Sequence, residues 1–149
     1  MKIFATVGST RYDSLFVAIE KALTENDEAI FQIADGEYTN PSVTIIKFVA
    51  DIHNYYQDAD LIITHAGAGS VYNLLEMGKK IIVVQNTERL DPHQSDLVRF
   101  VASNNYGLGC YEPSEVIEKI QQSHSFTPKT YQKNEFFKTK EICKSLKLL

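Results

Sequence analysis

Short apolar runs alternate along this chain with segments in which the apolar residues fall three or four positions apart. Apolar runs bounded by turn residues are typical of buried strands, whereas the wider spacing is typical of helices with one buried face. The runs predict strands over residues 3–7, 29–34, 43–49, 61–64, 81–84 and 108–111. Helices are predicted to begin at polar residues between these runs, at Asp13, Asp51, Ser70, Asp91 and Ser114.

A regular alternation of strands and helices is typical of α/β proteins. Right-handed crossovers then place helices on both faces of a doubly wound parallel sheet. We therefore predict a Rossmann-like α/β fold with about six parallel strands, followed by a C-terminal helix. Ligands bind such sheets outside the carboxyl ends of the strands. A site is therefore expected among loops 8–12, 48–50, 65–70 and 86–94.

The loop from His65 to Ser70 has the composition of a phosphate-binding turn. Gly67 and Gly69 let the backbone turn sharply and approach a ligand, and Ser70 is a good helix N-cap. A helix N-terminus presents unpaired N–H groups and the positive end of its dipole to an anion. A strand-turn-helix unit that carries Gly and Ser only for turn geometry remains the alternative. Gly8, Ser9 and Thr10, after the first strand, likewise form either a phosphate-binding turn or an ordinary turn between a strand and a helix.

Polar side chains in these loops are candidates for ligand contacts. His65 ends a strand at the expected crevice, where an imidazole can donate to a phosphate. Asn73 lies one helical turn after Ser70 on the same side, within reach of a sugar hydroxyl. His93 and Gln94 lie in the first turn of the helix that Asp91-Pro92 begins. Structural or solvated roles are open for all of them.

Composition places the chain among globular proteins of one domain. It has 149 residues, of which 44% are hydrophobic and 23% charged, which excludes a disordered or fibrous class. The net charge of −4 argues against general nucleic-acid binding. The apolar run 3–7 is too short for a secretion signal, so Cys110 and Cys143 are expected to be reduced thiols in the cytoplasm.

Charge is distributed unevenly between the body and the tail of the chain. Residues 124–149 hold six lysines against Glu135 and Glu141, a net charge of +4, which leaves −8 for residues 1–123. We therefore divide the chain into a ligand-binding domain, 1–123, and a basic helical tail, 124–149. Apolar residues share roughly one face of the predicted tail helix: Phe136, Ile142, Cys143, Leu146 and Leu149. That face packs either on its own domain or on a partner.

Three motifs occur in one order over nearly the whole chain: Thr6 to Thr10, His65 to Ser70 with Gly78 closing its helix, and Asp91 to Gln94. Together they resemble the glycosyltransferase family 28 C-terminal domain, the C-terminal half of a GT-B fold. Within that family the chain is similar to stand-alone donor-binding subunits. These are the soluble subunit of the N-acetylglucosaminyltransferase of dolichol-linked oligosaccharide synthesis and its bacterial counterparts in polysaccharide assembly. There, the acceptor-binding half is a separate, membrane-attached protein.

The resemblance implies roles for particular residues. Phe48 and Val49 match the segment that holds uracil, the turn from Gly67 to Ser70 matches the diphosphate site, and His93-Gln94 matches the pair that reads sugar hydroxyls. Asn73 departs from the Glu or Asp that more often binds the ribose, and an amide bonds hydroxyls more weakly than a carboxylate does. The expected donor-binding residues are Gly8, Ser9, Thr10, Phe48, Val49, His65, Gly67, Ala68, Gly69, Ser70, Asn73, His93 and Gln94.

The activity that the resemblance implies is an inverting transfer from a UDP-sugar to a lipid-linked saccharide acceptor. The helix N-terminus, hydroxyls and His65 would stabilise the departing UDP. No catalytic residue is assigned beyond this role of His65, because the family's base belongs to the other half. We expect no cofactor, and activity only with the membrane-attached partner, which would recruit this cytoplasmic chain to the cytoplasmic face of a membrane.

No metal site is expected. Asp58-Ala59-Asp60 imitates the DxD metal motif of other glycosyltransferases but precedes the strand 61–64, so it lies on the order of 15 Å from the crevice. We interpret it as a solvated turn. The histidines, at 53, 65, 93 and 124, show no zinc-like pair spacing.

Three other functions remain open. A non-catalytic accessory subunit that enhances a partner would bind little or no UDP. A UDP-sugar 2-epimerase uses a similar crevice but needs two domains in one chain. A dinucleotide oxidoreductase is the weakest alternative, because Gly67-Ala68-Gly69 lacks the third glycine of the usual motif and does not follow the first strand.

Overall fold

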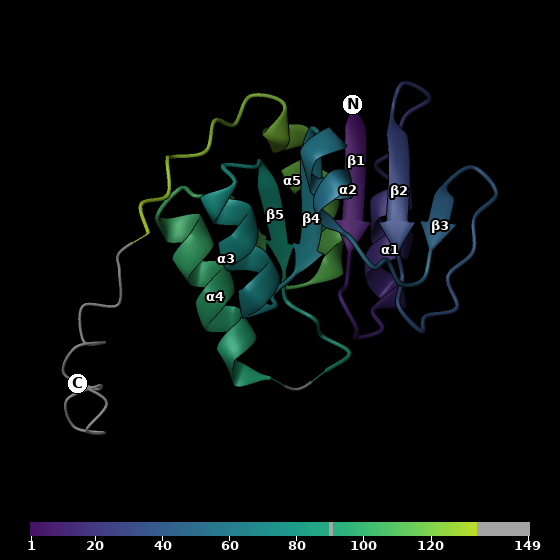
Figure 1. Cartoon of the computed structure of the whole chain (residues 1–149), viewed down its shortest axis with the longest axis horizontal. Helices are drawn as coiled ribbons and strands as arrows, with labels where there is room; N and C mark the ends of the chain where they lie inside the picture. Colours follow the sequence, from purple (N-terminus) through teal and green to yellow (C-terminus); the bar gives the residue numbers. More distant parts are fainter. Residues whose placement is uncertain (90, 134–149) are drawn as a thin grey trace.

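A parallel sheet with strand order β3-β2-β1-β4-β5-β6 forms the centre of the protein (Figure 1). The computed structural model describes residues 1–89 and 91–133. The strands are β1 (Lys2–Thr6), β2 (Glu28–Gln32), β3 (Thr44–Ile46), β4 (Leu61–His65), β5 (Ile81–Val84) and β6 (Leu108–Cys110). The helices are α1 (Asp13–Glu20), α2 (His53–Asp58), α3 (Ala68–Glu76), α4 (Pro92–Ser103) and α5 (Val116–Ser123), the last preceded by a 3-10 turn, Pro113–Glu115. The predicted doubly wound α/β fold is confirmed.

Helices cover both faces of the sheet because the strands are apolar on both sides. On one face, alternate residues such as Ile3 and Ile63 form a core with α1 and α5. On the other face, their neighbours Phe4 and Ile62 form a second core with α2, α3 and α4. Figure 1 shows these two helical layers in front of and behind the strands. Apolar runs without alternation, as in β4 and β5, are what burial on both faces requires.

The order of the strands reverses between β1 and β4. The chain builds β1, β2 and β3 in one direction and then returns to place β4 on the other side of β1. The loops after β1 and β4 therefore separate toward opposite faces of the sheet, which opens a crevice at their carboxyl ends. The loop after β5 lies beside it, since β5 pairs with β4.

Two sequence predictions need correction. The third strand is shorter than the predicted 43–49, because β3 is an edge strand that pairs with β2 over only Thr44–Ile46. Ser70 is not the cap of the helix that follows β4. Gly67 is the N-cap and its carbonyl oxygen accepts the first helical hydrogen bond, from Val71 N at 3.0 Å, so Ser70 lies within the first turn.

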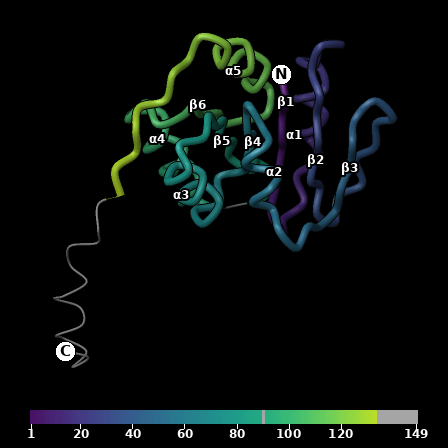
Figure 2. The backbone as a smooth tube through the Cα atoms, turned by 45° about the horizontal axis from the view of Figure 1, so that its top comes forward, coloured from purple at the N-terminus to yellow at the C-terminus, as the bar shows by residue number. Residues whose placement is uncertain are grey.

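The start of the basic tail packs on the domain. After α5 the chain crosses to the outside of α4 and α3 (Figure 2), where Lys129 N donates to Asn105 O at 2.8 Å. The Tyr131 ring lies 5.3 Å from that of Tyr106, and Lys133 pairs with Glu76 at 3.3 Å. Residues 134–149, which include the predicted amphipathic helix, lie outside the described residues, so partner docking by the tail stays a prediction.

Within residues 1–89 and 91–133, none of the helices has the length and apolar character that crossing a membrane requires.

Cys110 is a free thiol at the end of β6, with no exposed surface. Burial raises the pKa of this thiol to about 12, so almost none of the reactive thiolate forms at neutral pH. We expect iodoacetamide to leave Cys110 unmodified in the native protein and to alkylate it fully in urea. Peptide mapping by mass spectrometry separates it from Cys143. Rapid native alkylation of Cys110 would show that β6 opens readily.

Candidate functional site

The turn between β4 and α3 brings backbone N–H groups to the carboxyl edge of the sheet. Gly67 is extended, with φ −90° and ψ 123°, and α3 begins at Ala68. The first N–H groups of a helix have no partner within it. Those of Ala68, Gly69 and Ser70 are therefore available to an anion, at the positive end of the helix dipole.

His65 ends β4 and packs between two glycine turns. A Cβ on Gly67 would lie 2.4 Å from His65 Nε2, and one on Gly8 would lie 3.0 Å from Cε1. The imidazole therefore fills the space that both glycines leave. Burial lowers the pKa of His65, and the positive charge of Arg89 acts in the same direction. His65 is consequently neutral at neutral pH. It can donate a hydrogen bond to a phosphate but contributes no charge.

A buried amide that sequence reasoning missed joins the loops after β1 and β3. Gln32 ends β2, the strand between them, and is only 2% exposed. Its Oε1 accepts from Thr6 Oγ1 at 2.5 Å and from Gly8 N at 3.1 Å. Its Nε2 donates to Gly8 O at 2.8 Å and to Lys47 O at 2.6 Å. Gln32 thus holds the Gly8 turn, where φ is +65°, against the end of β3. The sequence feature that could have revealed this role is the polar Gln32 within the otherwise apolar run 29–34.

The N-terminus of α4 forms the opposite side of the crevice. The Asp91 side chain caps α4 by accepting from His93 N at 3.0 Å, and Pro92 follows it, which confirms the predicted start of this helix. Gln94 is 6% exposed and its Oε1 accepts from Asn86 N at 2.6 Å. The amide NH₂ is therefore the part of Gln94 that remains for a ligand, while the His93 side chain is exposed beside it.

A groove of about 480 Å³ lies between the N-termini of α3 and α4. This volume is in the range of small-molecule sites. Its walls come from the end of β4, from α3, from the loop after β5 and from α4. The residues that line it are His65, Ala66, Gly67, Ala68, Tyr72, Arg89, Asp91, His93, Gln94, Asp96, Leu97 and Phe100. The groove thus combines a helix N-terminus, one cation and several hydrogen-bonding groups.

The glycosyltransferase family 28 C-terminal domain matches residues 2–148 of the chain. The chain belongs to this family. Its family 28 membership agrees with the parallel α/β sheet and with a groove outside the carboxyl ends of β4 and β5.

Two curated proteins illustrate the relatives of this family 28 chain. The human UDP-N-acetylglucosamine transferase subunit ALG13 is 33% identical over 123 residues, which cover 72% of this chain and 11% of the human protein. The UDP-N-acetylglucosamine–N-acetylmuramyl-(pentapeptide) pyrophosphoryl-undecaprenol N-acetylglucosamine transferase of Neisseria meningitidis serogroup C is 28% identical over 89 residues, 60% of this chain and 25% of that enzyme. The chain thus spans about a tenth of the length of human ALG13 and about a quarter of the length of the Neisseria enzyme.

A solved structure matches the family 28 chain along almost its whole length. It is the solution structure of ALG13, with a TM-score of 0.63 and 15% identity, covering 95% of this chain and 94% of that one. At this identity the likeness shows the fold alone.

The structure brings some of the predicted donor-binding residues together. His65, Gly67, Ala68, His93 and Gln94 all line the groove. Gly8 joins them by its contact with His65, and Thr10 accepts a hydrogen bond from Arg89 at 3.1 Å. Ser9 and Gly69 are exposed, and Ser70 is partly buried, beside these turns.

Phe48, Val49 and Asn73 do not line the groove. Phe48 and Val49 follow β3 at the sheet edge, with β2 and β1 between them and β4. The Phe48 side chain is 64% exposed, and Gln32 anchors the preceding residue, Lys47, to the Gly8 turn. Asn73 is exposed on α3. Their predicted contacts with the base and the ribose remain predictions.

Buried polar contacts also tie the loops after β1 and β5 to each other. The Tyr12 hydroxyl donates to Gln85 O and accepts from Thr87 N at 3.4 Å. Asn86 Nδ2 donates to Arg11 O at 3.3 Å. Sequence reasoning missed both residues, because Tyr12 and Asn86 form these contacts with partners more than 70 positions away. The loops that border the groove are therefore held together across the end of β4.

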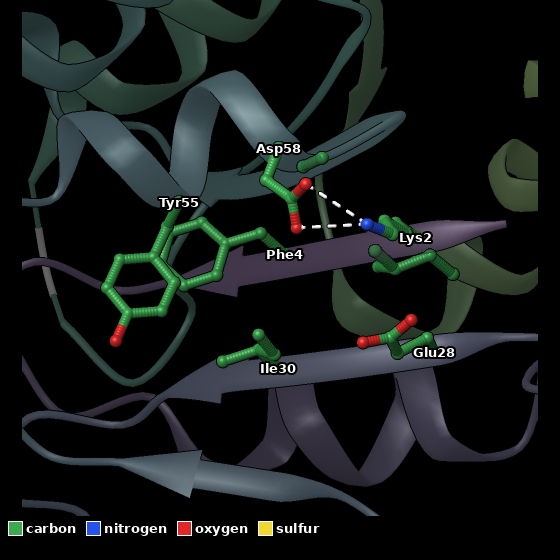
Figure 3. A pocket seen from close by; sticks show the side chains of 8 residues that line it. Lys2, Phe4, Glu28, Ile30, Tyr55 and Asp58 are labelled. Atoms are coloured by element: carbon green, nitrogen blue, oxygen red, sulfur yellow. Dashed lines mark hydrogen bonds and ion pairs between the residues drawn. The ribbon is translucent and has the colours of Figure 1, made fainter.

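The Asp58-Ala59-Asp60 motif lies at the opposite end of the sheet. Lys2, at the start of β1, pairs with Asp58 Oδ1 at 3.0 Å, and Lys2 N donates to Asp60 Oδ2 at 2.8 Å. Figure 3 shows Asp58 beside Lys2, near the stacked rings of Phe4 and Tyr55, in a cavity of only about 20 Å³. Both carboxylates are exposed, as expected for a solvated turn. Across the described residues, no three His, Cys, Asp or Glu side chains gather as a metal site would require.

Proposed function

We propose that this chain is the donor-binding subunit of a two-component, inverting glycosyltransferase that uses a UDP-sugar. The observation that carries the proposal is the groove between the N-termini of α3 and α4, outside the carboxyl ends of β4 and β5. Such a position favours a ligand with phosphate groups, because the N-terminus of α3, which no side chain caps, borders it. The names of the relatives support the donor, since both contain UDP-N-acetylglucosamine.

The same relatives support a lipid-linked acceptor and a partner. The Neisseria enzyme is named for a pyrophosphoryl-undecaprenol substrate, and ALG13 is named as a subunit. We assign acceptor binding to a membrane-attached partner, which would hold this chain at the cytoplasmic face of a membrane. The basic tail, residues 124–149, is the segment we propose for docking on that partner.

In the proposed reaction, an acceptor hydroxyl oxygen attacks the anomeric carbon of the donor sugar. The bond from that carbon to the β-phosphate oxygen breaks, and its electron pair leaves with UDP. The hydroxyl proton passes to a base of the partner. This chain contributes the N–H groups of Ala68, Gly69 and Ser70 and a donated hydrogen bond from His65, which stabilise charge on the leaving UDP. No metal is assigned to the step.

The proposal predicts that the purified chain binds UDP but transfers no sugar alone. Co-expression with a small protein that carries one N-terminal membrane segment should give transfer from a UDP-sugar to a lipid-linked acceptor. Activity should persist in EDTA. Calorimetry measures UDP binding, and a panel of UDP-sugars tested on the pair identifies the donor.

Two results would contradict this assignment in different ways. Robust transfer by the chain alone would remove the need for a partner. Absence of UDP binding, with a partner that is active without this chain, would instead favour the non-catalytic accessory role.

A further inference from the structure

Arg89 lines the groove and links the loop after β5 to the loop after β1. It follows β5, and its Nη1 donates to Thr10 Oγ1, on the loop after β1, at 3.1 Å. Strand β4 lies between β1 and β5 in the sheet. The Arg89 side chain therefore passes over the carboxyl end of β4, where His65 and the start of α3 meet.

Arg89 is the one lysine or arginine among the described residues that line the groove. His65, the other candidate for a positive charge at the end of β4, is neutral. The two lining carboxylates have their own partners, since Asp91 accepts from His93 N and Asp96 lies 3.6 Å from Arg99. The positive charge of Arg89 is therefore directed at the same space as the N–H groups of α3.

The present partner of Arg89 is replaceable. A neutral hydroxyl, that of Thr10, occupies one of its N–H groups, and the residue is exposed. A guanidinium presents several N–H groups in a planar fork that matches phosphate oxygens, and its bonds to an anion are stronger than those to a hydroxyl. A diphosphate at the N-terminus of α3 would thus offer Arg89 a better partner than Thr10.

We propose that Arg89 binds the diphosphate of the donor and supplies the positive side-chain charge that stabilises the leaving UDP. The inference rests on the proposed function and adds to it the residue that carries the charge. Arg89 exchanges its bond to Thr10 for bonds to phosphate oxygens when UDP binds. As the bond from the anomeric carbon to the β-phosphate oxygen breaks, the charge that develops on UDP then lies beside a fixed cation.

The test compares UDP with uridine on the purified chain by calorimetry. In Arg89→Gln we expect the Kd for UDP to rise about 10- to 100-fold, because bonds between charged groups are lost, while the Kd for uridine is unchanged. Arg89→Lys should weaken UDP binding less, since lysine keeps the positive charge but lacks the planar fork of guanidinium N–H groups. Lys21→Gln is the matched control: Lys21 is an exposed cation that follows α1, does not line the groove, and should leave both constants unchanged when replaced.

The outcomes separate the two proposals. Wild-type protein that binds neither UDP nor uridine would overturn the donor site itself. If the wild type binds UDP and Arg89→Gln binds it equally well, only the role of Arg89 falls. Equal losses for UDP and uridine would also overturn that role, since they indicate a structural effect.

A second measurement does not depend on nucleotide binding. Arg89 lowers the pKa of His65 by its charge, so Arg89→Gln should raise the pKa of His65 in an NMR titration. Lys21→Gln should leave that pKa unchanged, since Lys21 is not among the groups that line the groove. An unchanged pKa in Arg89→Gln would show that Arg89 does not lie over the end of β4 in solution.

Discussion

Replacing Gly67 by alanine is expected to lower the free energy of unfolding by about 1–3 kcal/mol, the usual range for adding atoms to a filled space. It should also abolish UDP binding. The new Cβ would lie 2.4 Å from His65 Nε2 and 3.0 Å from Cε1. The imidazole cannot simply turn away, because its Cε1 already lies close to the Gly8 turn on the other side. Either the ring leaves its site or the start of α3 moves, and both changes disrupt the proposed phosphate-binding turn.

Gly69, two residues further along the same turn, provides a matched control. A Cβ on Gly69 would meet nothing within 4 Å, and the residue is exposed within the first turn of α3. Gly69→Ala should therefore stabilise the protein by about 0.5–1 kcal/mol, the usual preference for alanine over glycine in a helix. Urea unfolding followed by circular dichroism measures both variants, and calorimetry with UDP measures binding by Gly67→Ala. A Gly67→Ala protein with wild-type stability and affinity would show that His65 has room to move.

Local sequence patterns predicted much of the fold. The strand over Ile81–Val84 and the helix that Asp91 and Pro92 begin appear where the sequence places them. Both depend on features within a few residues: an apolar β-branched run, and a cap with proline in the first turn. The doubly wound parallel sheet, with helices on both faces, followed from general rules for alternating strands and helices.

The predictions that failed depended on contacts between distant segments or on backbone geometry. The length of β3 is set by its pairing with β2, which its own sequence does not show. Ser70 has the chemistry of a cap, but the chain already turns into the helix at Gly67, where a side chain would collide with His65. Composition indicates that a cap is present, whereas packing decides which residue takes the position.

The candidate site could be predicted only in part for the same reason. Its glycine turns and the pair His93-Gln94 were visible as motifs. Arg89 and Gln32 were not, because each acts through partners on loops that are distant in sequence: Thr10 for Arg89, and Gly8 and Lys47 for Gln32. A strand terminus that carries a long polar side chain within an apolar run is a local signal for this kind of bridge.

Replacing Gln32 by leucine should have the largest effect on stability among the variants described. The N–H and the carbonyl group of Gly8 would both lose their partner on Gln32, whereas Lys47 O would keep only its bond from Ala34 N. An unsatisfied buried polar group costs about 1–3 kcal/mol, so we expect the free energy of unfolding to fall by about 3 kcal/mol or more. UDP affinity should fall at least tenfold, because the loops after β1 and β3 would no longer hold each other. Gln121→Leu, on the exposed side of α5, should change stability by less than about 0.5 kcal/mol.

Gln32→Glu separates the contribution of the donated hydrogen bonds to stability from that of the shape of the side chain. A glutamate keeps the shape and the accepting oxygen, but its carboxylate cannot donate to Gly8 O or Lys47 O. Burial beside two carbonyl groups raises the pKa of this carboxyl above its value in the unfolded chain. The variant should therefore be most destabilised, relative to wild type, at neutral pH. It should recover as the pH falls through the raised pKa, where the protonated acid donates again. A loss of unfolding free energy in Gln32→Glu that is the same at every pH would show that the hydrogen bonds donated by the Gln32 NH₂ contribute nothing. The shape of the side chain alone would then hold the Gly8 turn.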